Sequence, residues 1–169
     1  MKTRFNFFSI LTIAGAIVIL SSCGGGESTE GSNSESTETT EAAGTAPSEA
    51  VDPNVKSDSK GVGRFTSVEV GADIDADMAA KGKAVFETKC TACHKTTDEK
   101  LVGPGLKNIT NLRTPEWIMN MITNPEEMTK KDPVAKALFE EHLIQMTFQN
   151  VSDDEARQIL EYLRQNDKS

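Results

Sequence analysis

The feature that most constrains this chain is a pair of cysteines followed directly by a histidine, in the run Cys90-Thr91-Ala92-Cys93-His94. The chain has 169 residues and three cysteines, the third being Cys23. Two thiols separated by two residues can form a redox disulfide, bind a metal or hold a haem. Each of these uses needs a different fold, so the neighbouring residues decide between them.

The histidine next to the pair favours haem. Two thiols at the end of a helix can add to the two vinyl groups along one haem edge, and His94 is then held where its ring reaches the iron. A zinc site needs four ligands, and the only other histidine, His142, lies outside the usual spacing. A thioredoxin-type dithiol needs a βαβ context, which the sequence lacks. The motif therefore predicts one covalently attached haem c, bound through Cys90 and Cys93, with His94 as an iron ligand.

The N-terminus is typical of an export signal. A positively charged start precedes an almost unbroken apolar run at residues 7–20, which is short for a membrane span. The following Leu20-Ser21-Ser22-Cys23 resembles the lipobox of bacterial lipoproteins, in which cleavage before the cysteine is followed by its lipidation. We expect removal of residues 1–22 and anchoring through lipidated Cys23 on the periplasmic face of a bacterial membrane. An ordinary signal peptide and an uncleaved anchor are the alternatives, and both would also export the chain.

Amino-acid composition divides the exported chain into a predicted tether and a predicted folded domain. Residues 23–74 are predicted to be a disordered tether, because the part from Gly24 to about Lys60 is rich in Ser, Thr, Glu and Gly and has almost nothing to bury. Residues 75–169 are predicted to form one small domain.

Helical patterns dominate that domain. Asp75 or Asp77 can cap a first helix, and proline after a capping residue marks two more, at 117–123 and 134–143. The last helix begins with the capping box Ser152-Asp153-Asp154-Glu155 and carries an apolar stripe. These patterns predict an all-α fold of about four to five helices, whose core is too small for its length unless a haem fills the middle.

Residues 78–165 resemble the class I, mono-haem cytochrome c family. The resemblance rests on the helix that leads into the C-x-x-C-H motif, on Val102-Gly103-Pro104-Gly105-Leu106, and on Met146-Thr147-Phe148 before the last helix. It implies a small cytochrome c fold packed around one haem. It also implies that Gly82 and Phe86 meet Tyr162 and Leu163 where the first and last helices cross.

The family pattern also implies roles around the haem. The Pro104 carbonyl would accept a hydrogen bond from His94 Nδ1 and so orient the ring. Met146 would be the sixth iron ligand, although Thr147 stands where the family usually has proline. Met128 and His142 are the alternatives for that ligand, and His142 is otherwise interpreted as a solvent-exposed helix residue. Arg113 and Trp117 would hold a haem propionate.

An iron held by two protein ligands has no open coordination site, so the resemblance implies a one-electron carrier and not an enzyme. The expected partners are redox proteins such as a quinol-oxidising complex and a terminal oxidase or reductase, reached at the membrane through the lipid anchor. Nucleic acid is excluded, because the net charge is −8. The alternatives are a haem-based sensor of gas or redox state, a peroxide-reactive haem enzyme with a labile sixth ligand, or a cytochrome c subunit of a larger respiratory complex.

Overall fold

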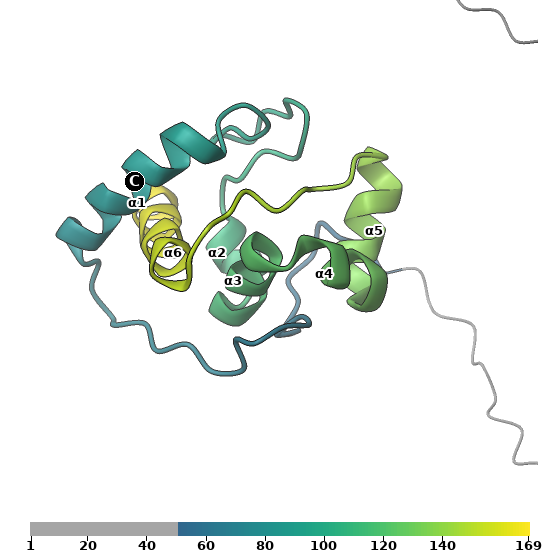
Figure 1. Cartoon of the computed structure of the whole chain (residues 1–169), viewed down its shortest axis with the longest axis horizontal. Coiled ribbons are helices and arrows are strands. Elements are labelled where there is room, and N and C mark those ends of the chain that lie inside the picture. The colour runs from purple at the N-terminus through teal and green to yellow at the C-terminus, as the bar shows by residue number, and fades with distance from the viewer. Residues whose placement is uncertain (1–50) are drawn as a thin grey trace, which may run out of the picture. The chain divides into compact units, whose positions relative to one another are not determined.

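The computed structural model describes residues 51–169, and this part of the chain contains six α-helices and no strand. The helices are α1 (Ala76–Lys89), α2 (Ile109–Leu112), α3 (Pro115–Thr123), α4 (Pro125–Lys131), α5 (Pro133–His142) and α6 (Asp153–Asp167). Figure 1 shows α1 crossing α6 on one side, α2 and α3 next to α6, and α4 and α5 on the other side. The prediction of an all-α fold is confirmed. Cys23 and residues 1–22 lie outside the described residues.

The helices begin where capping side chains satisfy their first backbone N–H groups. Asp75 accepts a hydrogen bond from the Met78 N–H, and Thr114 and Asp132 cap α3 and α5 in the same way. The capping box at the start of α6 has both of its hydrogen bonds. The helix α4 lies between the predicted helices at 117–123 and 134–143 and is not among them, because Asn124-Pro125 after Thr123 is typical of a helix stop. Proline is equally suited to the first position of a new helix, and α4 starts there.

The helices α1 and α6 cross with their backbones in close contact. A Cβ atom at Gly82 would lie 1.9 Å from the Gln158 carbonyl oxygen, so only glycine allows the two backbones to come this close. One turn further along, the rings of Phe86 and Tyr162 meet with centroids 5.5 Å apart. The predicted helix crossing is therefore present. Gly82 meets the backbone of α6 at Gln158 and Ile159, and the side-chain contact with Tyr162 belongs to Phe86.

Glu161 of α6 is a buried carboxylate that connects α6 to the start of α1. Glu161 in α6 is 1% exposed, and it accepts hydrogen bonds from Arg157, from Arg164 and from the backbone N–H of Asp75. Burial by itself raises the pKa of Glu161, but these hydrogen bonds outweigh it, and the pKa lies below its usual value. The charged form is therefore favoured, and it holds the capping residue of α1 against α6.

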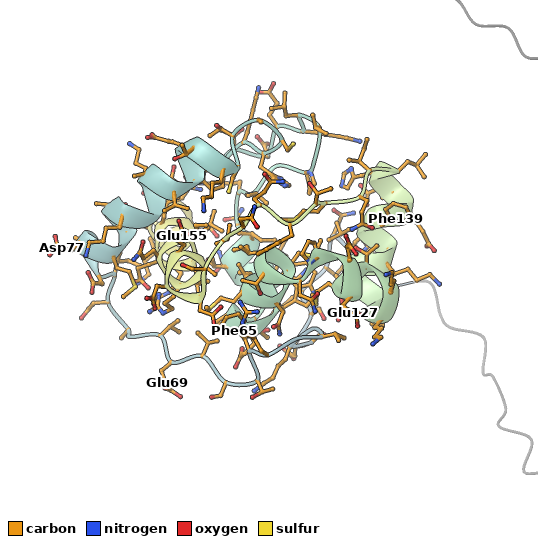
Figure 2. All side chains as sticks on the ribbon, in the orientation of Figure 1. Phe65, Glu69, Asp77, Glu127, Phe139 and Glu155 are labelled. Atoms are coloured by element: carbon orange, nitrogen blue, oxygen red, sulfur yellow. The ribbon has the colours of Figure 1, made fainter. Side chains whose placement is uncertain are left out.

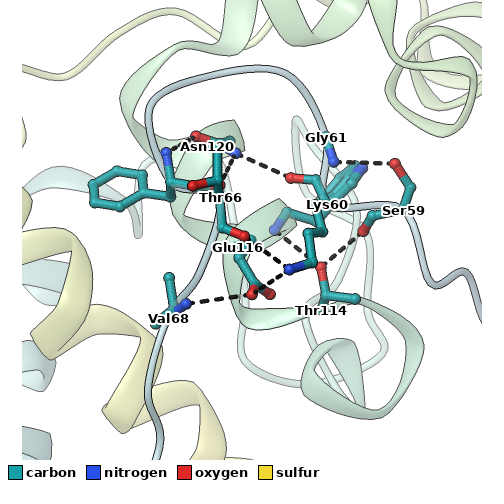
Figure 3. A network of polar contacts seen from close by, with 10 residues as sticks. Ser59, Lys60, Gly61, Thr66, Val68, Thr114, Glu116 and Asn120 are labelled. Carbon is teal, nitrogen blue, oxygen red and sulfur yellow. Dashed lines mark hydrogen bonds and ion pairs between the residues drawn. The ribbon is translucent and has the colours of Figure 1, made fainter.

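Residues 51–74, which we call the strap, contain no helix but pack against the domain. The Asn120 amide of α3 donates to the backbone oxygens of Lys60 and Phe65, and its own oxygen accepts from the Phe65 N–H. Glu116 accepts from the Val68 N–H and pairs with Lys60 at 3.3 Å. Figure 3 shows this network between the strap and α3. Figure 2 marks Phe65 on the strap, and its side chain packs on the hydrophobic core.

The strap corrects the predicted domain boundary. Residues 23–74 were predicted to be a disordered tether, yet residues 51–74 are held to the domain by backbone hydrogen bonds to buried polar side chains. Composition alone misses such contacts, because a segment that buries little apolar surface can still be fixed by its own N–H and C=O groups. Within residues 51–169 no helix is both long and apolar enough to cross a membrane.

Replacing Gly82 tests the crossing. Gly82→Ala places a methyl group against the α6 backbone and should lower the free energy of unfolding by about 3 kcal/mol, at the upper end of overpacking effects. Urea unfolding followed by circular dichroism measures this change. Gly71→Ala is the matched control, because its Cβ would meet only the Asp73 carbonyl at 3.6 Å. Equal stability of the two variants would contradict the close crossing.

Candidate haem site

The C-x-x-C-H motif forms a tight turn at the C-terminal end of α1. Cys90 caps the helix, and its carbonyl accepts hydrogen bonds from the N–H groups of Cys93 and His94, at 3.0 and 2.9 Å. Both cysteines are free thiols, with Cys90 half-buried and Cys93 exposed. Burial raises the pKa of the Cys90 thiol to about 11, and the nearby charge of Lys89 opposes this only in part. The turn thus presents two thiol sulfurs and one imidazole to the same cavity.

The His94 ring is fixed by the loop that follows. Its Nδ1 lies 3.0 Å from the Pro104 carbonyl oxygen, which is the contact predicted from the sequence. A Cβ atom at Gly103 would lie 2.5 Å from the ring, so glycine is needed for the loop to lie against it. Burial lowers the pKa of His94, and the hydrogen bond to Pro104 counteracts this in part. A neutral ring with Nδ1 held by a carbonyl leaves Nε2 free to bind a metal.

These groups line one large cavity. Its empty volume, including the open mouth, is about 1320 Å³, and its walls are mostly apolar. Cys90, Cys93 and His94 line one part of it, and Met146, from the loop between α5 and α6, lines another. Ile118 and Leu163 contribute to the walls from α3 and α6. Within the described residues no cluster of three or more His, Cys, Asp or Glu side chains is arranged to hold a metal ion.

Comparison with known proteins identifies the kind of site. A family model described as cytochrome c matches residues 79–167, more than half of the chain. The chain belongs to the cytochrome c family. A solved cytochrome c from Rhodothermus marinus is 43% identical, with 63% of this chain and 90% of that chain covered and a TM-score of 0.61. An engineered form of it bound to a carbene intermediate is 42% identical, with 63% and 92% covered and a TM-score of 0.59. No match was found among curated proteins.

The chain therefore binds one covalently attached haem c and is a haem-based electron carrier. The residues present fit this cofactor, since two thiols and a neutral imidazole stand at the wall of an apolar cavity open at one side. Cys90 and Cys93 would form the thioether bonds, and His94 Nε2 would bind the iron. The apolar walls would exclude water from the metal.

Of the candidate sixth ligands, Met146 and His142 line the cavity and Met128 does not. Met128 is fully buried, does not line the cavity, and its sulfur accepts a hydrogen bond from the Val62 N–H of the strap at 2.9 Å. It is therefore engaged in the core and does not face the haem site. Met146 and His142 both line the cavity, as does Met121 on α3. Gln145 holds the Met146 loop in place by donating to Thr129 Oγ1 and to the Met146 carbonyl.

Arg113 and Trp117 are arranged differently from the prediction that they hold a propionate. The Arg113 guanidinium does not line the cavity, and it donates to the backbone oxygens of Pro53, Val55 and Leu112. The Trp117 ring lines the cavity, but its Nε1–H donates to Asp132 at 2.9 Å. For Arg113 the reason is the strap, whose Pro53 and Val55 carbonyls could not be recognised as acceptors in a segment predicted to be disordered. For Trp117 the reason is the buried carboxylate of Asp132.

His142 was wrongly interpreted as a solvent-exposed residue. Its side chain is 10% exposed and lines the cavity together with Ala135 and Leu138 of the same helix. These positions follow one another at spacings of three and four, so all three lie on one face of α5. That spacing is the signal in the sequence that identifies His142 as an inward-facing residue, whereas the neighbouring Glu140 and Glu141 suggested the opposite.

Replacing Gly103 tests the role of the loop behind His94. Gly103→Ala should push the ring away from its position and weaken the iron–histidine bond, with a larger high-spin fraction in the visible spectrum and a stability loss of about 1–3 kcal/mol. Gly105→Ala is the control, because its Cβ would crowd the backbone of Thr97 and Asp98 and not the ring. A low-spin spectrum in Gly103→Ala identical to that of the wild type would contradict this role.

Proposed function

We propose that this cytochrome c is a membrane-anchored carrier that passes single electrons between respiratory redox proteins outside the cytoplasm. The observation that carries the proposal is that His94 and Met146 line one apolar cavity. Haem iron, when bound, supplies the ferric–ferrous couple. His94 offers a nitrogen whose orientation is set by Pro104, and Met146 offers a soft sulfur that favours the ferrous state. With both positions taken, the site carries an electron without binding a substrate.

The surface around the cavity supports electron exchange by contact with a partner. Six large apolar side chains, which we call the apolar rim, are exposed and either line the cavity or adjoin residues that do: Leu101, Val102, Phe139, Leu143, Ile144 and Phe148. Exposed apolar side chains concentrated beside one cavity are expected at an interaction site. Lys89 and Lys95, which flank the motif, pair with Glu155 and Glu99 of the same chain. Because both lysine charges are paired within the chain, apolar contact at the rim is favoured over electrostatic attraction of a partner to these lysines.

The expected partners remain a quinol-oxidising complex as donor and a terminal oxidase or reductase as acceptor. The support is the export signal, the lipobox ending at Cys23 and the acidic segment between Cys23 and the strap, which would hold the haem domain near membrane proteins.

Replacing Met146 tests the carrier function. The ferric wild type should have the methionine–iron charge-transfer band, and the reduced protein should not bind carbon monoxide. Met146→Ala should lose this band, bind carbon monoxide and have a lower reduction potential. Met121→Leu is the matched control, because it changes another methionine of the same cavity. A high-spin wild type, or a band that survives in Met146→Ala, would refute the proposed coordination.

Replacing Cys23 tests the membrane anchor. The wild type should sediment with membranes and be released by detergent, whereas Cys23→Ser should appear in the soluble exported fraction. Haem attachment should be unchanged in Cys23→Ser, because Cys90 and Cys93 are intact, and haem staining of both fractions measures this. A wild-type protein that is already soluble would contradict the anchor and leave the electron-carrier function untouched.

A further inference from the structure

His142 is a polar side chain in an apolar cavity, and one of its nitrogens has no partner. The side chain is 10% exposed, and Nδ1 is buried without a hydrogen bond to any described residue. Its Nε2 lies 3.9 Å from Glu141 Oε1, beyond hydrogen-bonding distance. A buried polar group without a partner is unfavourable, so the group that fills the cavity is expected to supply one.

Haem carries two propionates, which need hydrogen-bond donors wherever they leave water. The donors predicted from the sequence, Arg113 and Trp117, are engaged by backbone carbonyls and by Asp132. Thr129, another polar residue of the cavity, donates its hydroxyl to the Pro125 carbonyl at 2.8 Å. Lys89 at the cavity wall is held by Glu155. Among these donors His142 is the one left without a partner.

The position of His142 also matters electrostatically. Burial is the main cause of the lowered pKa of His94, and the charge of His142 lowers it further. The two rings therefore lie within electrostatic reach of each other across one cavity. A hydrogen-bond donor in the same cavity as His94 would influence the iron as well as the propionate.

We propose that His142 donates a hydrogen bond from its imidazole to a haem propionate. This inference rests on the haem site of the proposed function and adds a residue to it. The helix α5 positions the donor, since Ala135 and Leu138 place the same helix face against the cavity. In this role His142 binds the propionate and leaves the sixth iron position to Met146, as in the proposed function. By withdrawing charge from the propionate it raises the reduction potential.

The wild-type holoprotein provides the direct test, because the chain has only two histidines. With ¹⁵N-labelled histidine, the reduced protein should give one ring attached to iron and one ring with a slowly exchanging N–H. That N–H should show a nuclear Overhauser effect to the propionate methylene protons. A rapidly exchanging His142 ring with no such effect would overturn the proposal.

Substitution gives an independent test. His142→Phe keeps a ring but removes the hydrogen-bond donor. The reduction potential should therefore fall, and the propionate bending band in the resonance Raman spectrum should shift. The methionine–iron band should be unchanged. His142→Gln keeps an N–H donor, so the reduction potential and the propionate bending band should return towards their wild-type values. An unchanged potential and propionate band in His142→Phe would overturn the inference and leave the carrier function standing. Loss of the methionine–iron band in His142→Phe would also overturn it, by showing that His142 acts on the iron.

Discussion

The close crossing of α1 and α6 is the contact on which the rest of the structure depends. At Gly82 the two helices meet backbone to backbone, which fixes their distance. The haem-attachment turn follows α1 directly, and the Met146 loop leads directly into α6. Lys89, the last residue of α1, reaches both the Asn150 carbonyl before α6 and Glu155 in its first turn. The crossing therefore sets the separation between the two loops that carry the candidate iron ligands.

Buried polar side chains organise the opposite half of the domain. Asp132 is 2% exposed and accepts from the Trp117 indole, from the Ala135 N–H and from the Ser59 hydroxyl. It thereby joins α3, the start of α5 and the strap at one carboxylate. Such a group is tolerated in the interior only when its hydrogen bonds are satisfied, so each partner depends on the others. This arrangement turns the polar edge of Trp117 away from the cavity and leaves its apolar ring facing inward.

One consequence for function is that α4, α5 and the loop after them add polar groups to the cavity that the haem-attachment turn also lines. Thr129 and Gln145 hold the Met146 loop, and His142 lies on the inner face of α5. The same helix carries Phe139 of the apolar rim, which Figure 2 labels on α5. One helix thus contributes both to the inside of the haem site and to the surface proposed to meet a partner, so changes in α5 can affect potential and docking together.

Local sequence patterns were sufficient to predict the haem-attachment motif and most helices, because caps, proline positions and apolar stripes act within a few residues. The contact between His94 and Pro104 was also predicted from the sequence, since the family motif places these two residues at a constant spacing. The strap and the engagement of Arg113 were decided only by the tertiary structure. In each case the deciding partner is remote in sequence, or is a backbone group that every residue carries. A sequence pattern cannot distinguish one such carbonyl from another, whereas packing brings one particular carbonyl to one particular side chain.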